Sequence, residues 1–140
     1  MIDAAILVAA ARGRSSGALI IAARGAFLVA TDRAVLEARR RIEFGMGRPE
    51  LLAILDGLVA EMTVVPVAAL QPLLPMCEIA LRDAVASRNG SSKDAHILTL
   101  ARSVEGDIWT TDRDFGGAGV ATWSTPNLMR GLAARDDAAN

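Results

Sequence analysis

The sequence predicts an α/β fold in which helices cover a parallel sheet. Short runs rich in apolar and β-branched residues, such as "AFLVA" and "TVVPV", have the composition of buried strands. Longer stretches that begin with cap-type residues separate these runs, as expected for helices. Strands that alternate with helices along a chain usually pair in parallel, so the pattern indicates a layered α/β domain.

Each expected element has a place along the chain. The strand-like segments are residues 1–3, 26–30, 63–67, 107–111 and 119–123. The helical segments are residues 4–10, 15–24, 31–44, 49–62, 75–87 and 92–104, followed by a short helix after residue 123. The stretch "DRDF" predicts a short helical turn between the last two strands.

Chain length and composition limit the number of domains and the kind of core that the protein can form. The 140 residues suffice for one domain, which we expect over residues 1–133, with residues 134–140 as a polar and frayed C-terminal tail. Hydrophobic residues make up 52% of the chain and aromatic residues only 4%. The core must therefore consist mainly of Ala, Leu, Val and Ile.

Charge and cysteine content narrow the functional class. The net charge of −1 argues against broad binding to nucleic acid, but fourteen of the fifteen cations are Arg, which suits a local phosphate-binding patch. The single cysteine, Cys77, excludes an internal disulfide and, with the lack of a signal peptide, indicates the cytoplasm. The apolar N-terminal run is too short to span a bilayer, so no membrane partner is expected. His96 alone cannot build a His/Cys zinc site.

Five acidic residues occupy positions where a parallel sheet places functional groups. Asp3 and Asp112 directly follow strands, and Asp114 comes two residues later. Glu37 lies one turn into the helix after the second strand, and Asp94 lies in the first turn of the helix before the fourth. The functional crevice of such a sheet lies beyond the carboxyl ends of its strands, so these side chains are candidates for one site.

Each of these acids also has a structural interpretation. Asp94 and Asp114 follow a Ser or Thr by three residues, as in a capping box, and taken alone both are more typical of caps than of ligands. Glu37 has Arg41 one turn further along as a partner for a solvated ion pair, and helical periodicity places it away from the core face. Asp3 differs because apolar residues surround it, and a buried carboxylate requires a partner or an ion.

Taken together, the acids favour a metal site. Carboxylates that converge repel one another, and a divalent cation relieves this repulsion. A donor set made only of oxygen atoms, without His or Cys, suits Mg²⁺ or Mn²⁺. A cation held in this way, with open coordination positions, can bind a phosphodiester and activate water for its hydrolysis.

Three stretches of the chain resemble a known family. They are "IDAAILVAAARGRSSGAL" near the start, "LVATDRAVLEARRRI" in the middle and "KDAHILTLARSVEGDIWTTDRDFGGAGVATW" near the end, of which the last is the most specific. In these stretches the chain resembles PIN-domain ribonucleases, in particular the VapC-like toxins of bacterial type II toxin–antitoxin pairs. The likeness covers nearly the whole chain, although residues 46–81 match only in the order of their elements.

The resemblance implies a three-layer fold and a defined site. A central parallel sheet of about five strands would have the order 3-2-1-4-5, flanked by helices, with a switch point between strands one and four. The acidic quartet of the family would fall on Asp3, Glu37, Asp94 and Asp112, with Asp114 as a frequent fifth member. In this interpretation Asp3, Asp94, Asp112 and Asp114 hold Mg²⁺ or Mn²⁺, and Glu37 orients or deprotonates the attacking water.

The resemblance also implies an activity and partners. The protein would be a metal-dependent endoribonuclease that cleaves RNA, meets a cognate antitoxin protein and forms a homodimer. The residues considered for contact with the RNA backbone are Arg12, Arg14, Ser15, Ser16 and Arg113. A solvated loop is the simpler interpretation of the first four.

Two departures from the family pattern keep alternatives open. Only two residues precede Asp3, where the family has a longer first strand, and Ala5 stands where the family often has a small polar residue that orients the site. The main alternative is therefore a PIN-like module that lacks catalysis and acts through protein contacts. A third and weaker interpretation is a transferase site at "DRD", which would need a nucleotide-sugar pocket from a second domain.

Overall fold

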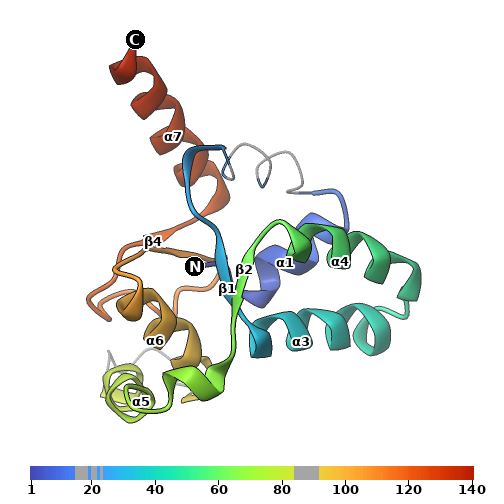
Figure 1. Cartoon of the computed structure of the whole chain (residues 1–140), viewed down its shortest axis with the longest axis horizontal. Helices are drawn as coiled ribbons and strands as arrows, with labels where there is room; N and C mark the ends of the chain where they lie inside the picture. The colour runs from blue at the N-terminus through green and yellow to red at the C-terminus, as the bar shows by residue number, and fades with distance from the viewer. Residues whose placement is uncertain (15–18, 20–21, 23, 84–91) are drawn as a thin grey trace.

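Two pairs of short parallel strands lie at the centre of the molecule (Figure 1). This computed structural model describes all residues except 15–18, 20–21, 23 and 84–91. The strand pairs are β1 (Val29–Thr31) with β2 (Thr63–Val65), and β3 (Ile108–Trp109) with β4 (Thr122–Trp123). Both pairs are parallel, as the alternation of strands and helices in the sequence predicts.

The N-terminal residues connect the two strand pairs. The N–H of Ile2 donates a hydrogen bond to the carbonyl of Val29 at 2.9 Å, and the N–H of Trp109 donates to the carbonyl of Met1 at 2.8 Å. Ile2 and Trp109 form a parallel bridge, but residues 1–3 do not form a strand of their own. A continuous sheet of five strands is therefore not confirmed, because each strand pairing extends over only two or three residues.

Helices lie on both sides of the strands (Figure 1). One group comprises α1 (Ala4–Ala11), α3 (Asp32–Arg40) and α4 (Leu52–Ala60), and the other comprises α5 (Leu74–Asp83) and α6 (Ala95–Ser103). Shorter helical turns are η1 (Arg41–Gly45), η2 (Pro49–Leu51), η3 (Val67–Leu70) and η4 (Ser92–Asp94). Helix α7 (Thr125–Ala139) ends the chain and projects from the body. The chain thus has the α/β architecture that the sequence predicts.

The core consists of two apolar clusters. The first joins α1, η1 and α4 through fully buried residues such as Ile6, Ile42 and Leu55. The second joins α5 and α6 to β3 and includes Leu98 and Phe115. Aliphatic side chains dominate both clusters, as the low aromatic content predicts. Full burial of one such side chain contributes about 1.5–3 kcal/mol to stability.

Two helices begin at residues whose side chains cap them, and the sequence predicts the cap of α3 but not that of α1. The Asp3 carboxylate accepts a hydrogen bond from the N–H of Ile6 at 3.0 Å and caps α1. The Thr31 hydroxyl accepts one from the N–H of Ala34 at 3.0 Å and caps α3. Such a cap contributes about 1 kcal/mol. The helix expected over residues 15–24 lies largely outside the described residues.

Two segments differ from the sequence-based expectation. Residues 112–115 form bends and a turn in place of a helical turn, because side chains in this loop accept hydrogen bonds from its own backbone. Residues 134–139 continue α7 in place of a frayed tail, because Ala and Arg favour the helix even when their side chains are exposed. None of the described helices combines the length and the apolar character needed to cross a membrane.

A candidate metal centre

An acidic pocket of about 280 Å³ lies at the N-terminal end of α1. Helix α3, the start of α6 and the loop after β3 supply its other walls. The lining residues are Asp3, Ala4, Ala5, Glu37, Arg41, Asp94, Ile97, Thr111, Asp112 and Phe115. Four of the five acids singled out in the sequence therefore line one space, although the chain separates them widely.

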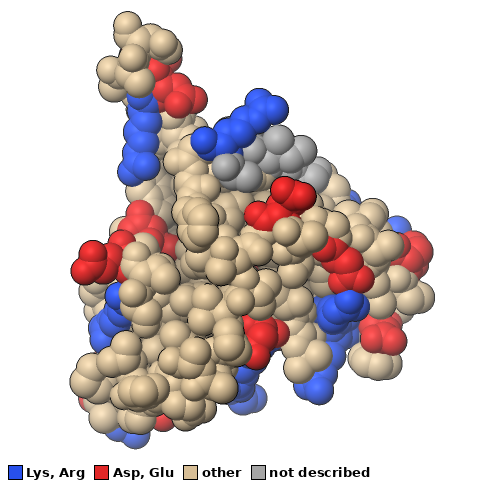
Figure 2. Space-filling view, in the orientation of Figure 1, with Lys and Arg blue, Asp and Glu red and all other residues tan. Residues whose placement is uncertain are grey.

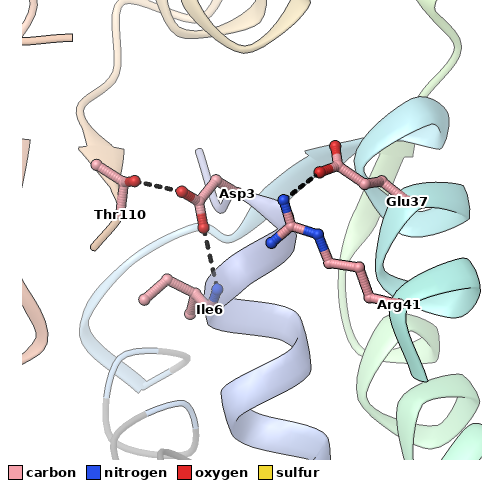
Figure 3. A network of polar contacts seen from close by, with 5 residues as sticks. All are labelled: Asp3, Ile6, Glu37, Arg41 and Thr110. Carbon is pink, nitrogen blue, oxygen red and sulfur yellow. Dashed lines mark hydrogen bonds and ion pairs between the residues drawn. The ribbon is translucent and has the colours of Figure 1, made fainter. Parts of the chain in front are cut away.

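Asp3 is almost fully buried, with 5% of its surface exposed. Its carboxylate accepts hydrogen bonds from the N–H of Ile6 and from the hydroxyl group of Thr110 (Figure 3). Burial raises the pKa of Asp3 above its ordinary value, and the hydrogen bonds from Thr110 and Ile6 partly offset this rise. The partner that a buried carboxylate requires is thus a hydroxyl group from a distant part of the chain.

A chain of hydrogen bonds continues from Asp3 into the loop after β3. The Thr110 oxygen that donates to Asp3 also accepts a hydrogen bond from the N–H of Asp112 at 2.9 Å. Asp112 Oδ1 in turn accepts one from the N–H of Asp114 at 3.1 Å. These local bonds take the place of the helix cap that the sequence pattern suggests for Asp114, because side chains of this kind compete with helical hydrogen bonding.

Three carboxylates form a cluster that fits a cation. Asp94, Asp112 and Asp114 each have a ligand oxygen, and these oxygens all lie within 4.8 Å of one another. Oxygens on opposite sides of a Mg²⁺ ion are about 4.2 Å apart, so the cluster fits one ion after small movements. Oxygen donors that are partly exposed suit Mg²⁺ or Mn²⁺, which retain water ligands. Asp3 and Glu37 lie outside this group of three.

The surroundings of Asp94 oppose the ionisation of its carboxyl group. Burial, and then the charges of Glu37, Asp112 and Asp114, raise the pKa of Asp94 to about 6. A bound cation would favour the ionised carboxylate and remove the repulsion. Asp94 occupies the N-cap position of α6, but its side chain makes no capping hydrogen bond there. Capping therefore does not explain why its carboxylate faces the others.

Glu37 and Arg41 form an ion pair on the α3 side of the pocket (Figure 3). Arg41 Nη2 donates to Glu37 Oε1 at 2.5 Å across one helical turn, as the sequence spacing predicts. The side chain of Arg41 is 53% exposed and that of Glu37 is 38% exposed. The pair therefore contributes only about 0.3–0.5 kcal/mol to stability. Among the described residues that line the pocket, Arg41 is the one cation.

Of the described residues that were considered for RNA contact, none lines the pocket. Arg12 and Arg14 follow the C-terminal end of α1, which lies about 12 Å along the helix axis from the pocket. Arg113 is exposed in the acidic loop after β3. Ser15 and Ser16 lie outside the described residues.

Two buried polar contacts emerge only from the structure. Thr110, which the sequence places at the end of a strand, is 3% exposed and orients Asp3. His96 is 1% exposed, its Nδ1 lies 2.8 Å from Thr31 Oγ1, and its Nε2 has no hydrogen-bond partner among the described residues. Burial lowers the pKa of His96 to about 4. A Thr-Thr pair directly before an aspartate is the only signal in the sequence that points to the first contact.

Comparison with known proteins identifies the family. The family model of the PIN domain matches residues 1–133 of the chain. No curated protein and no solved structure gives a significant match. PIN domains are typically metal-dependent nucleases, and the cluster of three carboxylates is compatible with that activity. On the basis of the family match, which covers nearly all of its residues, the chain belongs to the PIN domain family.

Proposed function

We propose that the protein is a metal-dependent endoribonuclease and the toxin of a type II toxin–antitoxin pair. Membership of the PIN domain family supports a nuclease function. The observation that carries the proposal is the convergence of Asp94, Asp112 and Asp114 within 4.8 Å, beside a pocket that Asp3 and Glu37 also line. Burial and the neighbouring acids together raise the pKa of Asp94, and a carboxyl group perturbed in this way within a cluster of acids is typical of a functional site.

The acidic cluster has the chemistry of a divalent cation site. Asp94, Asp112 and Asp114 would hold the ion through carboxylate oxygens, with Asp3 on the neighbouring wall of the pocket. When bound, Mg²⁺ or Mn²⁺ supplies a Lewis acid that stabilises charge on the phosphate and lowers the pKa of a coordinated water. Both ions prefer oxygen ligands, which are the only donors that these residues offer.

Other groups of the chain orient the reactants. Glu37 lines the pocket beside the cluster, and its carboxylate can accept the proton of the attacking water. Arg41 orients that carboxylate through their ion pair. Thr110 holds the Asp3 carboxylate towards the pocket through its hydroxyl group. In this way the Asp3 and Glu37 carboxylates have directions that are set before RNA binds.

Cleavage of a labelled RNA in Mg²⁺ tests the proposal. Asp3→Asn and Asp112→Asn each remove one negative charge while keeping the size of the side chain, and we expect both to abolish cleavage. Circular dichroism should show that both variants are folded, because Asn at position 3 can still cap α1. Asp136→Asn on the exposed part of α7 is the matched control and should cleave like wild type. Wild-type cleavage rates in both site variants would overturn the proposal.

A PIN-like module without catalysis is the alternative function. Two observations favour it: Ala5 lines the pocket without offering a polar group, and Arg41 already offsets part of the negative charge there. Thermal unfolding with Mn²⁺ separates the two functions, because an ion present at 100 times its Kd adds about 2.7 kcal/mol to the free energy of unfolding. Absence of this stabilisation, together with absence of cleavage, would favour the interaction module.

The partners of a toxin follow from the same proposal. A cognate antitoxin would insert a cationic segment into the acidic pocket, and the negative charge of the lining supports this mode of inhibition. Co-expression with the small protein encoded next to the gene should yield a stable complex without ribonuclease activity.

The toxin itself would form a homodimer. Size-exclusion chromatography with light scattering should show a dimer of the free chain.

A further inference from the structure

One face of α3 and η1 carries cations and an aromatic ring beside the acidic pocket. Five residues there have the spacing i, i+4, i+7, i+8 and i+11, which places them on the same side of a helix. They are Arg33, Glu37, Arg40, Arg41 and Phe44. Glu37 and Arg41 line the pocket, so the other three residues extend the same face outside it.

The outer residues of this face lie in solvent and outside the two core clusters. Arg33 and Arg40 are exposed and form no ion pair with any other described residue. Phe44 is 76% exposed, although phenyl rings are normally buried. Figure 2 shows a patch of cationic side chains near α3, with acidic side chains beside it and further cationic side chains elsewhere on this face. Cations around an exposed ring are the combination that proteins use to bind single-stranded nucleic acid.

The last turn of this face is a π-helix, which places Phe44 outside the core. Residues of η1 follow α3 with wider turns, and the N–H of Met46 donates to the carbonyl of Arg41 at 2.8 Å. Ile42 is fully buried in this turn, so η1 packs on the core while the ring of Phe44 remains in solvent. Single π-helical turns that extend an α-helix occur frequently at functional sites.

We propose that Arg33, Arg40, Arg41 and Phe44 form a track that holds a single-stranded segment of RNA next to the acidic pocket. This inference rests on the proposed nuclease function and names the surface that its substrate occupies. The carboxylates of the pocket repel RNA phosphates, so affinity must come from cations close to it. The three guanidinium groups bind phosphates, and the ring of Phe44 stacks on an unpaired base.

The geometry favours an unpaired strand over a duplex. Arg33 and Phe44 are eleven positions apart, which is about 16 Å along the helix axis and longer than one nucleotide. The ring of Phe44 can stack only on a base that has left the stack of a duplex. Arg41 reaches from η1 towards the space between Asp3 and Glu37 (Figure 3), so it joins the track to the pocket.

Binding of a fluorescent single-stranded RNA to the Asp112→Asn protein tests the track without cleavage. For single strands, the logarithm of the binding constant falls with the logarithm of the salt concentration by about 0.7 per phosphate contact. Arg33→Ala and Arg40→Ala should each lower this slope by about 0.7 and weaken binding. Phe44→Ala should weaken binding about fivefold or more at an unchanged slope, because stacking on a base is not an ionic contact.

Matched variants separate the track from a general effect of charge or stability. Arg82→Ala removes an exposed cation of α5, on the other side of the strands, and should change neither affinity nor slope. Phe44→Tyr keeps a stacking ring and should retain the affinity, whereas Phe44→Leu should lose it. The inference is overturned if Arg33→Ala and Arg40→Ala bind like Arg82→Ala, even when the wild-type protein cleaves RNA. A failure of the proposed nuclease function would give a different result. The variants would then show the expected salt dependence of RNA binding, but the wild-type protein would not cleave RNA in the presence of a metal ion.

Discussion

Thr110 donates its hydroxyl hydrogen to the buried carboxylate of Asp3, although the two residues lie far apart in the chain. They meet where the loop after β3 passes the start of α1. The same Thr110 oxygen accepts a hydrogen bond from the N–H of Asp112, so one side chain sets the position of two acids. Thr110 is therefore a positioning residue of the acidic pocket as well as the residue that follows a strand.

Replacement of Thr110 by Val should weaken the fold and the pocket together. Val has nearly the same shape but leaves a buried oxygen of Asp3 without its donor, which costs about 1–3 kcal/mol. The loss also raises the pKa of Asp3 further, because the Thr110 hydrogen bond lowers it. Thr110→Ser keeps the hydroxyl group and serves as the control. Urea unfolding measures both variants, and equal stability of the two would contradict this role.

Asp94→Asn should stabilise the metal-free protein at neutral pH. Burial and the neighbouring carboxylates raise the pKa of Asp94 to about 6, so its ionised form opposes folding above that pH. Removing this charge should add about 1–2 kcal/mol to the free energy of unfolding, allowing for solvent screening. Asp136→Asn, on the exposed part of α7, should leave stability unchanged. A loss of stability in Asp94→Asn would contradict the conclusion that burial and the neighbouring carboxylates oppose the ionised form of Asp94.

The affinity for Mn²⁺ should depend on pH through the same residue. A cation binds the ionised carboxylate of Asp94, and a proton competes with it below the pKa of about 6. The Kd for Mn²⁺ should be nearly constant above pH 7 and rise about tenfold per pH unit well below pH 6. Isothermal titration calorimetry across this range measures the dependence. A Kd that stays flat down to about pH 5 would exclude Asp94 as a ligand.

Asp94 and His96 should affect the stability of the metal-free protein with opposite dependence on pH. Folding raises the pKa of Asp94 from 3.8 to about 6, so its contribution to stability is present at low pH and is lost as pH rises through this range. Folding lowers the pKa of His96 from 6.5 to about 4, so its contribution is present above pH 6.5 and is lost as pH falls.

Two variants separate these opposing contributions. Asp94→Asn removes the contribution of Asp94 and keeps that of His96, so stability should rise more steeply with pH between about 4 and 6.5 than in wild type. In His96→Asn, which keeps a polar atom near the Nδ1 position that contacts Thr31, stability should rise less or fall over the same range. Urea unfolding at several pH values measures both slopes. Parallel pH profiles of the two variants would contradict the assignment.

Local features of the fold were predictable because nearby residues cause them. The sequence predicts Thr31 as a helix cap, and its hydroxyl accepts a hydrogen bond in the first turn of α3. The sequence also predicts a Glu37–Arg41 ion pair from their spacing, and the structure contains it. The partners in each of these interactions are three or four positions apart. They come into contact as soon as the residues between them form a helix.

Two capping patterns in the sequence did not lead to the expected caps. The capping pattern before Asp114 suggests a helical turn, but Thr110 and Asp112 accept the backbone hydrogen bonds of that loop. The capping pattern before Asp94 suggests a cap, but its side chain makes no capping bond. In both places the same local pattern is compatible with a cap and with other hydrogen bonds, and the pattern alone does not decide between them.

The sequence by itself determined the α/β class, the family, the cap of α3 at Thr31 and the set of candidate acids, because periodicity, capping and side-chain chemistry act over a few neighbouring positions. Only the tertiary structure decided that Asp3 is paired with Thr110, that the strands pair over only two or three residues, and that three carboxylates come within 4.8 Å of one another. The physical reason is that the partner and the pKa of a carboxylate depend on groups from other segments, and packing sets their distances.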